Sequence, residues 1–528
     1  MNKRILAVIS TIVLVLILIL LALPYYLGIK AQQSLEEQRI LLSKNAFLTV
    51  EKHEYQRGWF TSEETMQVRF KSTFLAGIQQ QLPDNVRTVL QQPITIVNHV
   101  SHGLFANGIR PVRAYVNTEF QYTPQAKQIL ARFFGQETPV KLENTINLSG
   151  SGKMHLIIPK FNYEELSGIK INWLGLESTI DYAQGFDSYD SHTNSLGLNV
   201  ILADKGKVSY ENLQLNSHTE NGHTDISLGS SNLHIKNMEF EWQDTGDSSI
   251  RLDQLVNLVT DLQIGAFINP TGSSMPAKIA VEDLNFSTKT SEQDKWINSN
   301  GKFGFAKLHY GSDNYGPLNI DVSAEHLDAA SLAALKNKIT QLSTQKLNNE
   351  ELRNAIVAAV RNEGLGLFTN SPLLRLNSFK LEMPQGVVDV HGYLTFKNLV
   401  ANDLQQLSLM LNKTESEMDF AVPQALLENV AVTQARSLFT VDENAGGVEA
   451  LEDIDQTIRL MIDSVVKSMR SRGFIVVENG VLKTHLKLKN GKLLLNGKGF
   501  TLEQPDDFPD QPDWDASAPA SAASSVRS

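Results

Sequence analysis

The chain has 528 residues, no cysteine and a formal net charge of −11 at pH 7. The absence of cysteine excludes disulfides, thiolate zinc sites, iron–sulfur clusters and thiol nucleophiles. The acidic balance, together with the lack of any lysine- or arginine-rich run, argues against a surface that follows a phosphate backbone. No nucleic-acid partner is therefore expected, while a hydrophobic content of 42% is enough for a large folded core.

The N-terminal segment carries the strongest single signal. Lys3 and Arg4 precede an apolar run over residues 5–23, which Pro24-Tyr25-Tyr26 follows. A run of about 20 apolar residues spans a bilayer core, and basic residues before it favour a cytoplasmic N-terminus. We therefore predict a cytoplasmic segment 1–4 and a single transmembrane signal anchor at 5–26, with the bulk of the chain in a bacterial periplasm. A cleaved signal peptide is the alternative, although its apolar core is usually shorter and small residues follow it.

The rest of the chain changes its pattern in stages. Residues 27–46 continue with helical periodicity and are expected to form a stalk that lifts the body from the membrane. Residues 47–325 form a β-rich region, because apolar and polar residues alternate there between turn-forming residues. Residues 326–503 mix helices with strands, and the Pro/Asp- and Ala/Ser-rich residues 504–528 are expected to be a disordered tail.

The predicted fold is mainly β with α additions, a β-rich α+β class. It contains one or two long, meandering, curved antiparallel sheets with several late helices, preceded by the transmembrane helix. Helices are expected at 328–339, 349–362, 423–438 and 449–472, where the apolar residues recur with a helical period. A hairpin that turns at Asn490-Gly491 closes the folded part, because this dipeptide suits a primed turn.

Motifs for catalysis or cofactor binding are missing from the sequence. It has no phosphate-binding loop, zinc-protease helix, nucleophile elbow or EF-hand loop. Gly364-Leu365-Gly366 fits a helix terminator better than a glycine-rich loop. His99 and His102 could share a metal with a third ligand, but a strand running into a turn at Gly103 explains them better. We predict no catalytic residue, cofactor or metal site.

One polar cluster keeps an enzymatic interpretation open. Asp187, Asp190, His192 and Asn194 could bind a hard cation or carry out acid–base chemistry. An ordinary polar loop between strands is the preferred interpretation, because the spacing matches no known ligand loop.

The densest local signal is the segment Tyr55-Gln56-Arg57-Gly58-Trp59-Phe60-Thr61-Ser62. Its aromatic residues are expected to pack where two strands meet, with Gly58 relieving the backbone. Arg57 would then bond turn carbonyls or a carboxylate. A role for Arg57 and Trp59 in gripping a ligand is the alternative to this structural corner.

The corner residues Tyr55, Arg57, Gly58 and Phe60 resemble a motif near the N-terminus of the YdgA family of bacterial envelope proteins. The resemblance continues at His102, Gly103 and Phe105, at Gly135, Glu137 and Pro139, at Ser149-Gly150, and in the closing hairpin at 490–503. His99 and the acidic tail after Glu503 depart from the pattern. The resemblance implies an inner-membrane protein that faces the periplasm, with a homodimer among its possible assemblies, and it supplies no reaction or catalytic residues.

Three functions are compatible with these observations. The first is a non-enzymatic, membrane-anchored periplasmic protein that binds a lipid or lipoprotein on a curved sheet surface or groove. The second is a structural or assembly factor that binds protein partners of the cell envelope through a sheet edge or the late helices. The third is a hydrolase with an unrecognised site, using Asp187, Asp190 and His192.

Overall fold

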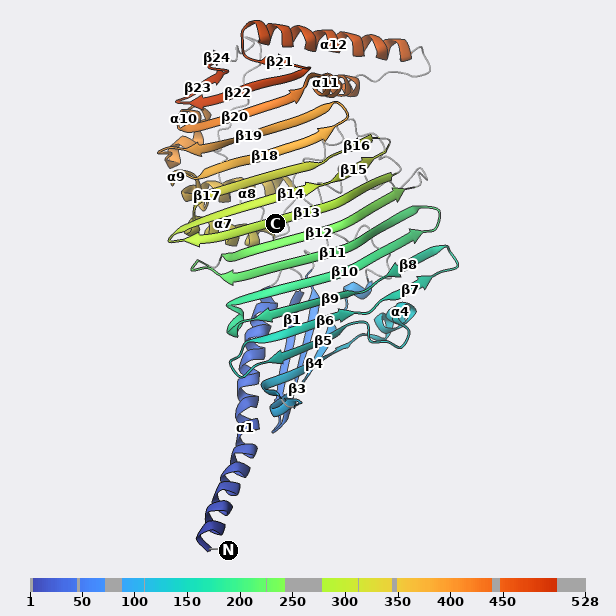
Figure 1. Cartoon of the computed structure of the whole chain (residues 1–528), viewed down its shortest axis with the longest axis vertical. Coiled ribbons are helices and arrows are strands. Elements are labelled where there is room, and N and C mark those ends of the chain that lie inside the picture. Colours follow the sequence, from blue (N-terminus) through green and yellow to red (C-terminus); the bar gives the residue numbers. More distant parts are fainter. Residues whose placement is uncertain are drawn as a thin grey trace, which may run out of the picture.

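The computed structural model describes residues 3–44, 48–71, 88–108, 110–224, 226–242, 278–311, 313–343, 349–438 and 447–500. Its strands form one 24-stranded sheet in which every pairing is antiparallel. Figure 1 shows the strands stacked along the long axis of the molecule, with the N-terminal helix at one end. The mainly β prediction is confirmed, and the open question of one or two sheets is answered by a single sheet. The predicted tail 504–528 lies outside the described residues.

Helix α1 (Lys3–Lys44) runs without a break through Pro24. Its second half is not a free stalk, because Ala31 and Leu35 are buried against Val100, Ala114 and Ile146 of the sheet. The expectation of a stalk that lifts the body away is therefore wrong: the apolar side of this segment has a partner. Side chains are described from residue 22 onwards, so those of residues 5–21 in the predicted span lie outside the description. Within what is described, no helix is long and apolar enough to cross a membrane.

The half of the sheet next to α1 contains the first twelve strands. They are β1 (Leu48–Arg57), β2 (Thr61–Phe70), β3 (Ile94–Asn107), β4 (Arg110–Gln121), β5 (Lys141–Ile146), β6 (Gly152–Ile158), β7 (Phe161–Glu164), β8 (Ile169–Trp173), β9 (Leu176–Tyr182), β10 (Ser188–Leu202), β11 (Gly206–Asn221) and β12 (Ser227–Trp242). Helix α4 (Pro124–Phe134) and the short helix η2 (Gln184–Phe186) interrupt them. The sequence did not predict α4, whose first turn is capped by the Thr123 hydroxyl.

The far half contains the remaining strands and the late helices. The strands are β13 (Lys278–Gln293), β14 (Trp296–Phe305), β15 (Lys307–Tyr310), β16 (Asp313–Tyr315), β17 (Leu318–Asp328), β18 (Leu373–Met383), β19 (Gly386–Phe396), β20 (Thr414–Pro423), β21 (Val476–Glu478), β22 (Val481–Lys489), β23 (Lys492–Leu495) and β24 (Lys498–Phe500). The helices are α7 (Ala329–Ser343), α8 (Asn349–Asn362), α9 (Leu365–Thr369), η3 (Ala401–Gln405), α10 (Leu407–Asn412), α11 (Gln424–Leu438) and α12 (Gly447–Ser471). All four predicted helices and the hairpin are confirmed.

Most strands pair with their neighbours in sequence, so the sheet is a meander. It departs from this order where β6 pairs with β9, β8 with β10, β14 with β17 and β20 with β22. Residues 301–310, whose alternation favours a single strand, are divided at Ala306, whose N–H bonds to the Glu282 carbonyl. Beyond that point β13 pairs with β15 instead of β14.

The cross-strand register defines two faces that run across the whole sheet, since residues directly opposite each other share a face. One of them is here called the inner face. It carries a row of residues in which each lies opposite the next on the neighbouring strand: Glu64, Asn98, Thr118, Leu142, Leu156, Ser178, Thr193, Leu215, Leu233, Phe286, Phe303, Ile320, Phe379, Val390, Phe420 and Thr484. The opposite side of the sheet is here called the outer face. On it, the residues next in sequence to those of the inner-face row form a second row that is polar throughout: Glu63, His99, Asn117, Glu143, His155, Thr179, His192, Asn216, Asn232, Ser287, Lys302, Asp321 and Ser378.

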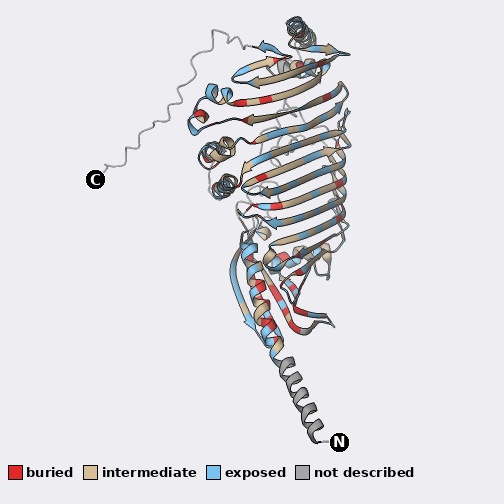
Figure 2. Cartoon of the chain, turned by 60° about the vertical axis from the view of Figure 1, so that its left-hand side comes forward, coloured by how far each residue is buried: buried red, intermediate tan, exposed pale blue. Residues whose placement is uncertain are grey.

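The helices are distributed unevenly over the sheet. Helix α1 packs on the strands of the first half, whereas α7, α8 and α9 lie together beside β17 at one end of the strands. Figure 2 shows that buried residues concentrate around α1, while intermediate and exposed residues dominate the far strands. Helix α12 packs against α11 beyond the last strands.

Candidate functional site

The predicted corner is the tight turn between β1 and β2, and it lies against α1. The Gly58 N–H donates to the Thr61 carbonyl at 2.9 Å, and a Cβ at Gly58 would lie 2.5 Å from that oxygen. The Arg57 guanidinium carbon sits 5.2 Å from the centroid of the Tyr25 ring, and its Nη1 donates to Gln32 Oε1 at 3.4 Å. The corner therefore joins the sheet to the helix through a cation–π contact.

His102 makes the second contact between sheet and helix. Its ring is buried, with Nδ1 2.8 Å from the Pro24 carbonyl and Nε2 3.1 Å from Ser62 Oγ. The carbonyl must accept, so Nδ1 carries the proton and Nε2 accepts from the serine. Burial lowers the pKa of His102. A Cβ at Gly28 would lie 2.7 Å from this ring, so the close approach of helix and strand requires glycine there.

The other motif residues lie apart from the corner. Gly135 ends α4 with a positive φ of 60°, and Glu137 and Pro139 follow in the loop to β5. Gly150 lies in the β5–β6 turn, where a Cβ would meet the Arg113 guanidinium at 2.8 Å. The side chain of Phe105 lies outside the described residues, although its backbone belongs to β3. The motif residues thus fix several turns and do not gather in one site.

A cavity of about 650 Å³, here called the α1 cavity, lies between α1 and the inner face. It is lined mainly by apolar side chains: Leu35, Leu41, Leu42, Leu48, Met66, Ile96, Val116, Phe120, Leu142, Met154, Ile180 and Phe186. Its size and apolar lining are those of a site for a small apolar ligand.

Polar groups that line the α1 cavity bond to one another and to neighbouring side chains. Glu64 is almost fully buried, and its carboxylate accepts from His53 Nε2 at 2.9 Å and from Asn98 Nδ2 at 2.7 Å. Tyr182 donates to Asn144 Oδ1 at 2.7 Å, and burial raises the pKa of Tyr182 to about 12. Because these groups have partners within the protein, they leave a largely apolar surface to a ligand. No motif in the sequence marks these groups, although Glu64 alternates with the apolar Met66 and Val68 and so indicates an acid on a buried face.

A second depression, here called the distal hollow, lies far from α1 and has a volume of about 640 Å³. Every residue that lines it comes from β13, β14, β17, β18, β19 or β20, and none from a described helix. Val322, Leu374 and Leu376 form part of its lining, and Val322 is 43% exposed and Leu374 39%. Nearby on the same face, Phe286 is 42% exposed and Phe303 37%. The distal hollow is therefore an open apolar surface.

The two His- and Asp-containing clusters lie on the outer face. His99 is half exposed and bonds to Glu119 at 3.2 Å, so it has surroundings different from those of His102. Asp190 and His192 point outward from β10, where Asp190 bonds to His218 and His192 to Asn216 across the strand pair. The loop expected around these residues is instead a strand that begins at Ser188, directly after Asp187. Among the described residues, no group of His, Cys, Asp and Glu is arranged to hold a metal.

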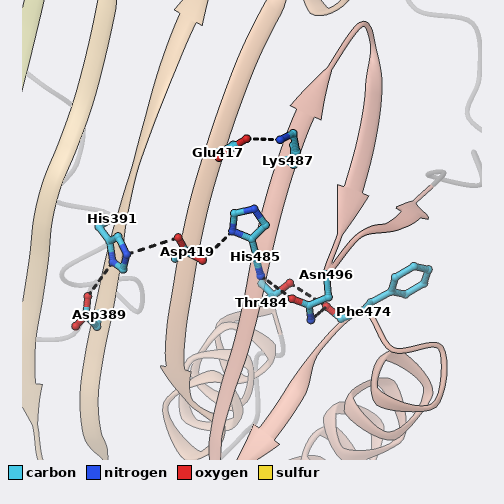
Figure 3. A network of polar contacts seen from close by, with 9 residues as sticks. All are labelled: Asp389, His391, Glu417, Asp419, Phe474, Thr484, His485, Lys487 and Asn496. Carbon is cyan, nitrogen blue, oxygen red and sulfur yellow. Dashed lines mark hydrogen bonds and ion pairs between the residues drawn. The ribbon is translucent and has the colours of Figure 1, made fainter.

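The outer face at the far end carries a polar network shown in Figure 3. Asp419 accepts from His485 Nδ1 at 2.8 Å and lies 3.6 Å from His391. Asn496 fixes the closing hairpin, because its Oδ1 accepts from the His485 N–H at 2.9 Å and its Nδ2 donates to the Phe474 carbonyl at 3.0 Å. These contacts join neighbouring strands.

Fold and site together define an elongated antiparallel-sheet protein with one polar face and one mainly apolar face that α1 covers at one end. The chain belongs to the family described as bacterial protein of unknown function (DUF945), whose model matches residues 1–503. No curated protein matches the chain.

Proposed function

We propose that this protein is a non-enzymatic, membrane-anchored member of the bacterial cell envelope, of the YdgA-like type, that binds the acyl chains of a lipid or lipoprotein on the inner face of its sheet. The anchor is the apolar run within residues 5–26, which places the N-terminus in the cytoplasm and the sheet in the periplasm. The observation that carries the proposal is the exposed apolar surface of the distal hollow. Soluble proteins seldom leave a contiguous apolar patch of this kind uncovered.

The continuity of the inner face supports an extended ligand. The α1 cavity and the distal hollow lie on the same face, and Leu215, Leu233 and Phe286 follow one another in register between them. An acyl chain is long, flexible and apolar, so it gains free energy of about 0.8 kcal/mol for each buried CH₂ group. On the outer face, the described row that runs beside these residues is polar throughout.

The test is purification of the full chain from bacterial membranes in mild detergent, followed by mass spectrometry of the lipids that remain bound. Phe286→Glu places a charge on the inner face and should remove most of the bound lipid. Asn285→Glu is the matched control, because it adds the same charge to the adjacent exposed residue on the outer face. Lipid retained equally by both variants, or absent from the unmodified protein, would contradict the proposal.

A second candidate function is a structural or assembly factor that binds envelope proteins. The observation in its favour is the apolar stripe of α12, where Leu460, Met461 and Val465 are more than half exposed. This helix carries five acidic residues, at positions 449, 452, 453, 455 and 463, against three basic ones, and its net negative charge makes it unsuited to an anionic membrane surface. Stoichiometric recovery of an envelope protein, with loss of it in Met461→Glu, would favour this candidate over lipid binding.

A further inference from the structure

We propose that Tyr25, Tyr26, Trp59 and Phe60, which we call the aromatic collar, insert into the interfacial layer of the bilayer and seat the body of the protein on the membrane. This inference rests on the anchor of the proposed function and assigns a role to the corner motif. The four rings come from two separate elements and are all exposed: 38%, 54%, 51% and 52% in that order. Four large aromatic side chains in water at one place require an explanation.

The position of the aromatic collar points to lipid. Only Pro24 separates Tyr25 and Tyr26 from the apolar run 5–23, and the Trp59 ring lies beside Tyr25 with centroids 5.2 Å apart. The turn between β1 and β2 therefore reaches the level of the chain at which the predicted span ends. Tyrosine and tryptophan are enriched at this level of a membrane because their rings are apolar and their polar atoms remain hydrated.

Contacts around the aromatic collar hold the turn between β1 and β2 against α1. Arg57 stacks on Tyr25, the His102 N–H donates to the Phe60 carbonyl at 2.9 Å, and the His102 ring bonds to the Pro24 carbonyl at 2.8 Å. Helix and turn thus present their aromatic rings as one unit. A second contact with the bilayer beside the anchor would fix the tilt of the sheet, which a single helix alone would leave free.

This seating has a consequence for the inner face. Helix α1 continues from the aromatic collar into the α1 cavity, and the strands of the distal hollow lie farther along the long axis (Figure 1). The α1 cavity would then lie next to the outer leaflet of the membrane and the distal hollow would lie away from it. An apolar ligand from the bilayer would meet the covered end of the inner face first.

The chain has no cysteine, so single cysteines can be labelled at chosen positions. We would attach an environment-sensitive fluorophore to Phe60→Cys in the full chain, reconstitute it in phosphatidylethanolamine and phosphatidylglycerol vesicles, and add lipids with a quencher near the headgroup. The matched control is Leu166→Cys, an apolar residue that is fully exposed in the β7–β8 turn. Quenching at position 60 should be several-fold stronger than at position 166. Trp59→Cys, which is 51% exposed in the same turn, repeats the measurement if the Phe60 variant does not fold, and Tyr26→Cys reports the end of the anchor.

Flotation of the vesicles separates the two proposals. Protein that floats with the vesicles but shows equal quenching at positions 60 and 166 overturns the aromatic collar and leaves the anchor intact. Quenching at position 26 without quenching at position 60 also overturns it, since the turn would then be off the membrane. Protein that does not float overturns both the anchor and the aromatic collar.

Discussion

The two ends of the inner face have the same architecture and opposite surroundings. Near α1, Val100, Val116 and Ile146 are at most 1% exposed because the helix covers them. In the distal hollow, Val322 and Leu374 occupy equivalent inward positions on their strands and remain about two-fifths exposed. The comparison shows that alternation along a strand determines which residues face inward, whereas a covering element determines whether that face becomes core.

This difference affects the free energy of the fold. Apolar area removed from water contributes about 25 cal/mol per Å², so the end covered by α1 gains a stabilisation that the distal hollow lacks. Apolar area that stays in contact with water adds nothing to folding, but it can still gain free energy from a ligand. The covered end therefore supports the structure, whereas the distal hollow keeps the apolar area that the proposed ligand would bury.

The largest expected effect is the loss of packing under α1. Leu35→Ala removes a side chain that is 4% exposed in the cluster with Val100 and Ile146. It should lower the free energy of unfolding by about 2–5 kcal/mol, the usual cost of a cavity in a packed core. Leu374→Ala makes the same chemical change in the distal hollow and should cost about 1 kcal/mol or less. Chemical denaturation in detergent micelles measures both, and equal losses would contradict the division into covered and uncovered ends.

Much of this fold could be predicted from the sequence. Alternating stretches such as 278–286 predict strands because one face is apolar and the other polar. The helix predicted at 328–339 is capped by the Asp328 side chain, which accepts from the Ser331 N–H at 2.9 Å. Asn490-Gly491 forms the predicted turn, with positive φ at both residues. Local signals of this kind depend on neighbours in sequence, which a single chain displays directly.

The candidate site could not be predicted, because it depends on partners far apart in sequence. Nothing near Ala31 or Leu35 indicates that the helix packs on strands more than sixty residues later. The contact of His102 with Pro24 spans 78 residues. Both ring nitrogens of His102 have protein partners, Pro24 and Ser62, where the sequence also allowed a metal. Strand alternation gives the two faces of each strand but leaves open which of them a helix covers.

A smaller effect is expected where α1 approaches β3. Gly28→Ala should raise intrinsic helix stability by about 1 kcal/mol, but the new Cβ would lie 2.7–3.0 Å from the atoms of the His102 ring. Overpacking of this kind costs about 1–3 kcal/mol, so we expect a net loss of stability. Gly499→Ala is the control, because a Cβ there meets nothing within 4 Å. A thermal unfolding midpoint that rises in the Gly28 variant would show that the helix and β3 are not in contact.

The smallest expected effect is the pH dependence of the contact between α1 and β3. Burial lowers the pKa of His102 in the folded protein, so the unfolded chain takes up a proton first as the pH falls. Stability from this group is therefore complete above the ordinary histidine pKa of about 6.5 and is lost below it, by at most about 1.4 kcal/mol per pH unit. The covered end should loosen before the far strands do, because His102 bonds α1 there and the distal hollow has no such contact with the helix. Hydrogen exchange of β3 between pH 7 and pH 5 measures this, with His102→Gln as the variant that should flatten the dependence. Exchange of β3 that accelerates equally in that variant would assign the effect to other groups.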